Sequence, residues 1–186
     1  MPYPAQIDRE QLILTAWEMV EAEGTESLSL GRLAAKLGIK APSLYNHIQN
    51  KAALIRAVNE MTQHRLFTSL NDVIQQENTE AQLLAIAIAY REFALAHPTI
   101  YMLAFSTIEA EARPDPDEQE NAALTLQVIV ARLVKDEAYA LPFLRGFWAL
   151  VHGFVMLEIN QQFRRDGSID DAYIQSVKAF IEGIKA

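Results

Sequence analysis

The segment LAAKLGIKAPSLYNHIQNK, residues 33–51, places apolar residues at helical spacing on both sides of a glycine. Gly38 readily adopts the strained backbone conformation of a sharp turn, and Ile39 is expected to bury that turn against a core. The apolar side chains on the two sides can hold two short helices at a fixed angle; they are Leu33, Ala34, Leu44 and Ile48. The segment therefore predicts a helix-turn-helix motif.

Pro42 stands near the start of the second helix of this motif, which we expect over about residues 41–48. In the first turn of a helix its missing N–H costs nothing, and its fixed φ favours helix initiation. The second helix of such a motif enters the major groove, where short side chains allow a close approach and polar ones reach bases or phosphates. The predicted DNA contacts are Ser29, Lys40, Ala41, Pro42, Ser43, Tyr45, His47 and Lys51.

The charge distribution favours a polyanionic partner. The chain has a net charge of −8, yet no Asp or Glu occurs between Glu26 and Glu60, while five Lys and Arg residues do. A local excess of positive charge in an acidic protein is typical of a surface that binds the nucleic-acid backbone. Protein partners do not demand such one-sided charge, so double-stranded DNA is the predicted partner.

Helical spacing of apolar residues continues through the rest of the chain, without the alternation typical of a β-strand. Asp8, Ser29, Asn50 and Thr79 are the expected N-caps, and Gly24 is expected to end the first helix. Later helices are expected over about residues 79–97, from Pro98 onward, and over about 121–135, 139–165 and 170–185, with a loop over 106–121. These elements predict an all-α fold of about nine helices, with a three-helix DNA-binding domain in residues 1–52 and a helical domain in residues 53–186.

Composition sets the expected compartment. The chain has no cysteine, which excludes disulfides and cysteine-based metal sites and favours a reducing compartment. Its N-terminus lacks the basic start and apolar run of a signal peptide. The most apolar segment, residues 147–159, carries His152 and Glu158 and is shorter than a membrane span. A cytoplasmic protein without a membrane partner is therefore expected.

The histidines argue against an enzyme. His64, His97 and His152 lie on separate expected helices, and no paired metal-ligand motif, nucleophile elbow or phosphate-binding loop occurs. We therefore expect no catalytic residues, no metal site and no cofactor.

Two stretches of the N-terminal region carry a family resemblance. DREQLILTAWEMVEAEG, residues 8–24, and SLSLGRLAAKLGIKAPSLYNHIQNKAAL, residues 27–54, resemble the DNA-binding domain of the TetR family of one-component transcriptional regulators. FWALVHG, residues 147–153, resembles the Trp-His-Gly signature of one subset of C-terminal domains in that family. The sequence departs from the common pattern at Lys40, Pro42 and Ile48, so the resemblance implies the fold and leaves the operator sequence open.

The resemblance implies that residues 53–186 bind a small ligand and dimerise through the last two long helices. Small residues at helical spacing within residues 145–159 also favour close packing of two helices. The expected dimer interface comprises Gly146, Ala149, Leu150, Gly153, Phe154, Leu157, Ile174, Val177 and Ile181. The expected ligand pocket comprises Tyr90, Phe93, Tyr101, Phe105, Trp148, His152 and Met156. Aromatic and methionine side chains suit an apolar or aromatic effector. The alternative is that these side chains fill the hydrophobic core.

The expected function is that of a ligand-responsive regulator, with repression as the favoured outcome. One short recognition helix reads few base pairs, so a homodimer on a palindromic operator is expected, with a small-molecule effector that lowers operator affinity. Two alternatives remain open: a transcriptional activator, and a helical protein-interaction module without an effector.

Overall fold

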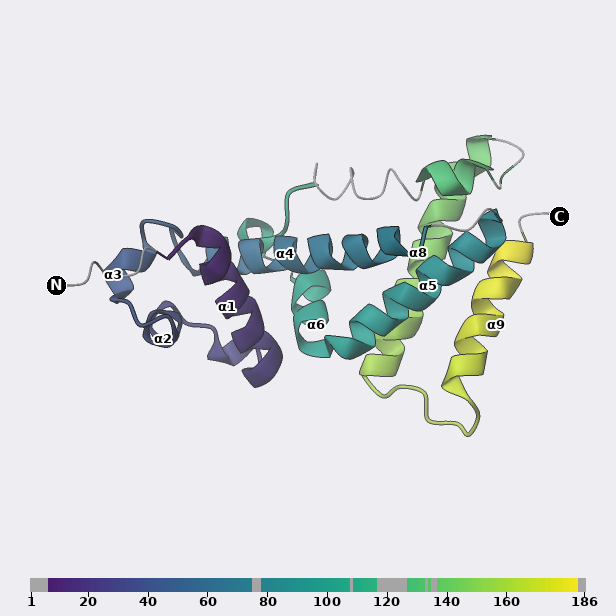
Figure 1. The fold of residues 1–186 in the computed structure, drawn as a ribbon. Coiled ribbons are helices and arrows are strands. Elements are labelled where there is room, and N and C mark those ends of the chain that lie inside the picture. The colour runs from purple at the N-terminus through teal and green to yellow at the C-terminus, as the bar shows by residue number, and fades with distance from the viewer. Residues whose placement is uncertain are drawn as a thin grey trace. The chain divides into compact units, whose positions relative to one another are not determined.

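The structure, a computed structural model, describes residues 7–74, 78–107, 109–116, 127–132, 134 and 137–183. These residues form α-helices and short 3-10 helices, and no β-strand occurs among them (Figure 1), which confirms the predicted all-α fold. The chain divides into two compact units, Met1–Arg65 with His97–Glu118 and Leu66–Ala96 with Gln119–Ala186. The domain boundary expected between residues 52 and 53 falls in the first turn of α4 (Lys51–Asp72), which continues from one unit into the other, so the two divisions differ.

The first unit begins with α1 (Arg9–Glu23). Its predicted cap is present, because Asp8 Oδ1 accepts the Gln11 N–H at 2.7 Å. The helix ends at Gly24, whose φ of 85° lies in the left-handed region that favours glycine. The 3-10 helix η1 (Thr25–Ser27) follows. The apolar stripe of α1 is buried as its spacing predicts; it consists of Leu12, Ile13, Ala16, Trp17 and Val20.

The predicted helix-turn-helix consists of α2 (Leu30–Lys36) and α3 (Ala41–Leu44). The turn between them is a Schellman motif. Gly38 has a φ of 68° and donates its N–H to the Ala35 carbonyl at 3.2 Å, and the Ile39 N–H reaches the Ala34 carbonyl at 3.0 Å. The two helices pack through a set of buried side chains that also contact α1 and α4; it includes Leu33, Ala34, Leu44, Ile48 and Leu54.

Helix α3 is shorter than the helix predicted from the sequence. The helix was expected to reach Ile48 but ends at Leu44. Beyond it the chain tightens into turns, because Tyr45, Asn46 and His47 donate to carbonyls three residues earlier rather than four. The expected Asn50 cap then starts α4, with Asn50 Oδ1 accepting the Ala53 N–H at 2.8 Å.

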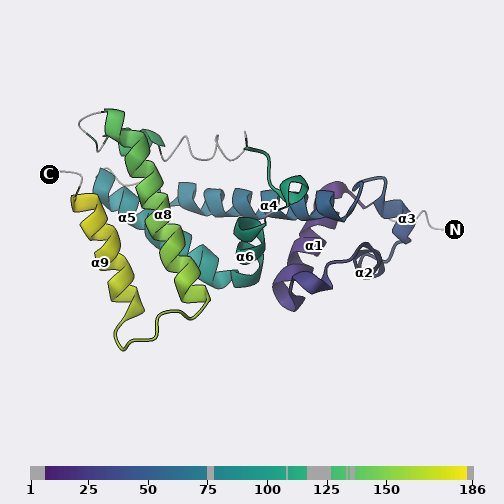
Figure 2. The same ribbon diagram turned by 180° about the vertical axis from the view of Figure 1, so that it is seen from behind.

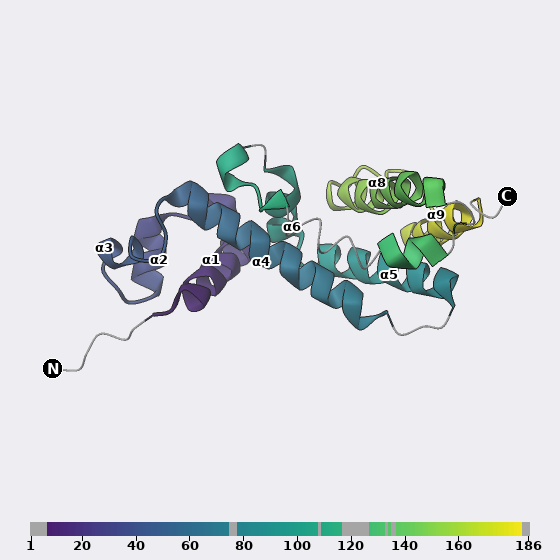
Figure 3. The same cartoon turned by 90° about the horizontal axis from the view of Figure 1, so that it is seen from above.

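The first unit also contains α6 (Pro98–Ser106) and the 3-10 helix η2 (Ala110–Ala112). Pro98 opens α6 as predicted, and the carboxylate of Glu21 in α1 accepts the Ile100 N–H at 3.0 Å. Asn59 of α4 donates to the Ala112 carbonyl at 3.0 Å, which holds η2 beside the first half of α4 (Figure 3). The loop expected over residues 106–121 therefore includes a helical turn, and its residues 117–121 lie outside the described part of the chain.

The second unit is built around α5 (Thr79–Ala96), α8 (Ala140–Ile159) and α9 (Ile169–Glu182), with the 3-10 helix η3 (Glu137–Tyr139) before α8. The three long helices contact one another in pairs. Figure 2 shows α8 and α9 side by side, joined by the loop over residues 160–168. The core between these helices is apolar and includes Leu83, Ile86, Phe147, Val151 and Val177.

Two helix ends in this unit differ from expectation. Asn78 caps α5 by accepting the N–H groups of Glu80 and Ala81, so Thr79 is the first helical residue rather than the cap. Helix α8 ends at Ile159, not near residue 165, because a second Schellman motif stops it. Gln161 adopts a φ of 54°, and the Gln162 N–H reaches the Leu157 carbonyl at 2.8 Å.

Two expected helices lie partly outside the described residues. Of the helix expected over residues 121–135, residues 127–132 are described and helical. Of the helix expected over 170–185, the last two residues fall outside the described part.

Helix α8 is longer than the apolar segment identified from the sequence. Its 20 residues are long and apolar enough to cross a bilayer by length and composition alone. The core helix of a soluble protein passes the same test, and α8 buries Phe147, Val151 and Val155 within the second unit. From the sequence, residues 147–159 are too short for a membrane span, and the 20-residue helix corrects that length. Length alone therefore does not argue against a membrane span.

Candidate functional site

Helix α3 presents nearly all of its side chains to solvent. Leu44 is buried and anchors the helix, whereas Lys40, Ala41, Pro42 and Ser43 are exposed. The Tyr45 side chain, just after the helix, is 59% exposed, which is unusual for a large aromatic residue and favours a contact with a partner. His47 is half-buried on the same turn. The structure thus brings five of the eight predicted DNA contacts to the α3 segment itself, with His47 beside them.

The two other predicted contacts lie at the first turns of helices. Ser29 Oγ accepts the Arg32 N–H at 3.2 Å and caps α2, and its hydroxyl hydrogen remains able to donate to a phosphate. Lys51 is the exposed first residue of α4. A lysine at the positive end of a 22-residue helix is well placed to bind a phosphate, because the side-chain charge and the helix dipole act together.

Fewer basic side chains are available around α3 than the five Lys and Arg residues between Glu26 and Glu60 suggest. Arg32 forms an ion pair with Glu23, which lies outside the acid-free window but reaches it from the end of α1. Arg56 Nε donates to the Glu111 carbonyl at 3.0 Å and is held against η2. Lys36, Lys40 and Lys51 are exposed, and none of them has an ion-pair partner among the described residues.

Three of the predicted pocket residues meet in the second unit. Tyr90 Oη lies 3.2 Å from His152 Nδ1, and the Tyr90 and Trp148 ring centroids are 5.3 Å apart. Phe67 of α4, which the sequence did not single out, adds an edge contact to Trp148 at 6.2 Å. Burial lowers the pKa of His152 below its ordinary value, so the imidazole is neutral near pH 7. This aromatic cluster, consisting of Phe67, Tyr90, Trp148 and His152, offers rings and one neutral polar pair.

Of the remaining predicted pocket residues, two lie on the helices of that cluster and two belong to the other unit. Phe93 and Met156 are half-buried on α5 and α8, the helices that carry Tyr90 and His152. Tyr101 and Phe105 belong to the first unit, where their ring centroids lie 4.7 Å apart and Tyr101 is fully buried. Their helical spacing is equally typical of a core stripe, which the sequence did not distinguish from a pocket.

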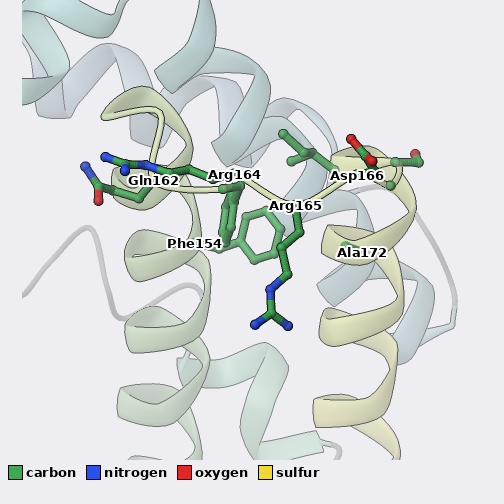
Figure 4. A pocket seen from close by; sticks show the side chains of 10 residues that line it. Phe154, Gln162, Arg164, Arg165, Asp166 and Ala172 are labelled. Carbon is green, nitrogen blue, oxygen red and sulfur yellow. The ribbon is translucent and has the colours of Figure 1, made fainter.

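A cavity of about 380 Å³ lies at the loop between α8 and α9 (Figure 4). None of the seven predicted pocket residues lines it, whereas Phe154, expected in the dimer interface, does. Sequence analysis missed this site because it extended α8 through the residues that form the loop. The lining includes Phe154, Phe163, Arg164, Arg165, Ile169 and Ala172.

The expected dimer residues divide into buried and open groups. Val177 and Ile181 are buried within the single chain. Gly146 also serves packing inside the chain, because a Cβ there would lie 2.8 Å from Cζ of Phe180. By contrast, a Cβ at Gly153 would meet no atom within 4 Å. The open or partly open group consists of Ala149, Leu150, Gly153, Phe154, Leu157 and Ile174.

An ion-pair cluster that the sequence did not predict joins the three helices of the second unit. Arg91 of α5 donates to both oxygens of Glu158 in α8, at 2.7 and 2.6 Å, and to Asp170 of α9 at 2.6 Å. These carboxylates raise the Arg91 pKa further above its ordinary value. The Arg91 guanidinium also lies over the Tyr173 ring, 5.3 Å from its centroid. In the described part of the chain no three His, Asp or Glu side chains gather in a way that would hold a metal ion.

Family models match both parts of the chain. A model described as "Bacterial regulatory proteins, tetR family" matches residues 12–58, which include α2 and α3. A second model, described as "Tetracyclin repressor-like, C-terminal domain", matches residues 83–180, more than half of the chain.

Two relatives align over most of their length. The chain is 33% identical over 160 residues to Rv0681 of Mycobacterium tuberculosis, covering 84% of this chain and 72% of that protein. It is 25% identical over 178 residues to YobS of Bacillus subtilis, covering 96% of this chain and 93% of that protein. Both are described as uncharacterised helix-turn-helix-type transcriptional regulators.

Solved structures share the fold. A protein of unknown function from Rhodococcus matches all of the chain with a TM-score of 0.82 and 21% identity. A TetR variant from Acinetobacter baumannii, in complex with minocycline, covers 97% of both chains with a TM-score of 0.74 and 23% identity.

Proposed function

The chain belongs to the TetR family of DNA-binding transcriptional regulators, which are not enzymes, and from this premise we propose that it represses transcription by binding a palindromic operator as a homodimer. A small apolar or aromatic effector releases it from the DNA. The protein acts in the cytoplasm, where bacterial operator DNA lies.

The face around α3 carries the proposal of sequence-specific DNA binding. Its helix exposes Ala41, Pro42 and Ser43, whose short side chains leave room for close approach to base edges. Lys40 and Lys51 flank this helix without a carboxylate partner among the described residues. No acidic residue within this window repels the phosphates, so Lys40 and Ser43 are proposed to read bases while Tyr45, His47 and Lys51 hold the backbone.

The open face of α8 supports the homodimer. Ala149 is exposed, Gly153 has free space beside it, and Leu157 is 47% exposed. These residues recur every four positions and so share one side of the helix. Small and apolar side chains in such a row let a second copy pack closely, and a two-fold dimer carries two copies of α3 for the two half-sites of a palindrome.

The aromatic cluster supports an uncharged effector. Burial keeps His152 neutral, and its contact with Tyr90 provides a polar pair among rings. The Acinetobacter TetR variant holds minocycline, which supports the idea that this fold accommodates a small molecule here too. An effector that separates the recognition helices would lower operator affinity by differential binding to the two states.

Selection of bound sequences from a random DNA pool tests the proposal. A palindrome with half-sites about one helical turn apart is expected. On the selected site, Lys51→Ala should weaken binding for every sequence and reduce the salt slope by about one. Lys178→Ala, an exposed lysine on α9, controls for the same loss of charge.

Three further outcomes test the base contacts, the docking on DNA and the direction of regulation. Ser43→Ala should change the selected sequence rather than the salt slope; an unchanged preference removes its base-reading role. If Lys51→Ala leaves both affinity and slope as they were, the docking of α3 and α4 on DNA is wrong. A reporter gene behind the selected operator that is activated rather than silenced would replace repression by activation.

A further inference from the structure

The cavity between α8 and α9 has an apolar floor. The ring centroids of Phe154 and Phe163 lie 4.6 Å apart, and the Phe154 ring also contacts Tyr173 at 5.0 Å. Ile169 and Ala172 of α9 complete the apolar lining. The volume of about 380 Å³ is in the range of small-molecule sites, and Phe163 remains partly exposed at its mouth.

The rim of the cavity carries two arginines on the loop that joins the helices. Arg164 and Arg165 have no hydrogen-bond or ion-pair partner among the described residues. Figure 4 shows the Arg165 side chain projecting between α8 and α9 beside Phe154, whereas Arg164 points away with Gln162. Asp166 is the one acid in the lining.

Two of the three acids on the adjoining helix ends are already engaged, whereas Asp171 in the first turn of α9 is exposed. Glu158 near the end of α8 and Asp170 near the start of α9 both accept hydrogen bonds from Arg91. Arg165 lies beside this apolar surface, and neither Asp166 nor any other carboxylate of the described residues forms an ion pair with it. An organic anion would supply that charge, and its apolar body would cover the two phenylalanine rings.

We propose that the cavity between α8 and α9 binds a small organic anion with an aromatic or aliphatic body. Its carboxylate, or an equivalent anionic group, pairs with Arg165, and its apolar part lies on Phe154 and Phe163. This site is separate from the aromatic cluster around Trp148, and its existence does not depend on whether the chain represses transcription.

A second copy of the chain is the competing occupant. Leu157, on the open face of α8, lies close in sequence to the loop, so a dimer contact that extended this far would close the cavity. A two-fold contact centred on the loop would, however, bring the Arg164 and Arg165 side chains of two chains together. Like charges oppose such a contact, which favours the small anion.

Two fluorescent probes of nearly the same shape test the proposal. Anilinonaphthalene sulfonate carries an anionic group, and phenylnaphthylamine has the same rings without it. Arg165→Gln should raise the dissociation constant of the sulfonate about fivefold, as expected for an exposed ion pair, and leave that of the neutral probe unchanged. Phe163→Ser should weaken both probes.

Arg145→Gln is the matched control, because it removes the same charge from an exposed position of α8 about 13 Å along the helix from Phe154. Thermal unfolding verifies that each variant folds. The proposal fails if Arg165→Gln and Arg145→Gln have equal effects on the sulfonate. It fails as well if probe binding disappears as the chain dimerises in sedimentation experiments, which would show that a second copy fills the cavity.

Discussion

Arg32 in the first unit and Arg91 in the second both pair with glutamate, in opposite surroundings. The side chains of Arg32 and Glu23 are 55% and 41% exposed, whereas those of Arg91 and Glu158 are 15% and 13% exposed. An exposed pair in water contributes about 0–1 kcal/mol to stability and can exchange partners readily. A pair largely removed from water cannot lose one member without leaving an uncompensated charge.

This difference separates what each unit does with its charges. On the DNA-facing unit, a weakly held arginine can leave its carboxylate for a phosphate. In the second unit, the ion-pair cluster ties α5, α8 and α9 together, and the Arg91 and Glu158 side chains are largely removed from water. An Arg–Glu pair is thus exposed and able to change partners in the first unit, and it is largely buried and fixed in the second.

Glu158→Gln should give the largest effect. It leaves the Arg91 guanidinium largely buried with half of its compensation, so the free energy of unfolding should fall by roughly 2–4 kcal/mol, measured by urea denaturation. Asp170→Asn removes the other partner, whose side chain is 75% exposed, and should cost less than about 1 kcal/mol. Equal losses in the two variants would mean that burial does not distinguish the pairs.

Tyr173→Phe should give the next largest effect. The buried hydroxyl donates to the Ala87 carbonyl at 2.6 Å, and burial raises its pKa. Removing the hydroxyl should lower the free energy of unfolding by about 1 kcal/mol, the usual net value of such a bond. Tyr139→Phe alters a 65% exposed tyrosine of the same unit and should leave stability unchanged. If both variants lose the same stability, the hydrogen bond from Tyr173 to Ala87 does not account for the loss.

Glu23→Gln should strengthen DNA binding. Without its carboxylate partner, Arg32 is free to contact a phosphate, so operator affinity should rise about threefold and its salt dependence should steepen. Glu18→Gln, an exposed acid of α1 without a recorded partner, removes the same charge. An equal gain in both variants would assign the effect to net charge rather than to release of Arg32.

His152→Gln should give the smallest effect, visible only in acid. Burial lowers the pKa of His152 in the folded chain, whereas the unfolded chain titrates near the ordinary value of about 6.5. The unfolded state therefore binds the proton first, and stability falls as pH drops below about 6.5, by less than about 1 kcal/mol at pH 6. The variant should lose this part of the pH dependence. An unchanged profile between pH 7 and 5.5 would mean that His152 is not the group responsible.

The structure confirms much of the local reasoning. The caps at Asp8 and Ser29, the turn at Gly38 and the buried positions Leu33 and Leu44 all follow from spacing and residue type. The end of α8 did not follow, because Gln161 carries no signal for a left-handed conformation that glycine usually provides. That error also hid the loop that forms the cavity.

The pocket and interface residues show where spacing stops being informative. Tyr90 and Tyr101 both fit an apolar stripe, yet one meets His152 and the other is buried in a different unit. Val177 and Gly153 both fit a helix-pairing face, yet Val177 is buried inside one chain while the space beside Gly153 is open. A helical period states that residues share a side, and it does not state what covers that side.

By itself, the sequence determined the helix-turn-helix, the all-α fold and the acid-free face, because these depend on residues a few positions apart. Only the tertiary structure decided which charges are paired, which rings meet and where the cavity lies. Glu23 reaches Arg32 across nine positions of the chain, and Asp170 reaches Arg91 across 79. Contacts at such separations depend on how helices pack, and packing is set by many side chains at once rather than by any local pattern.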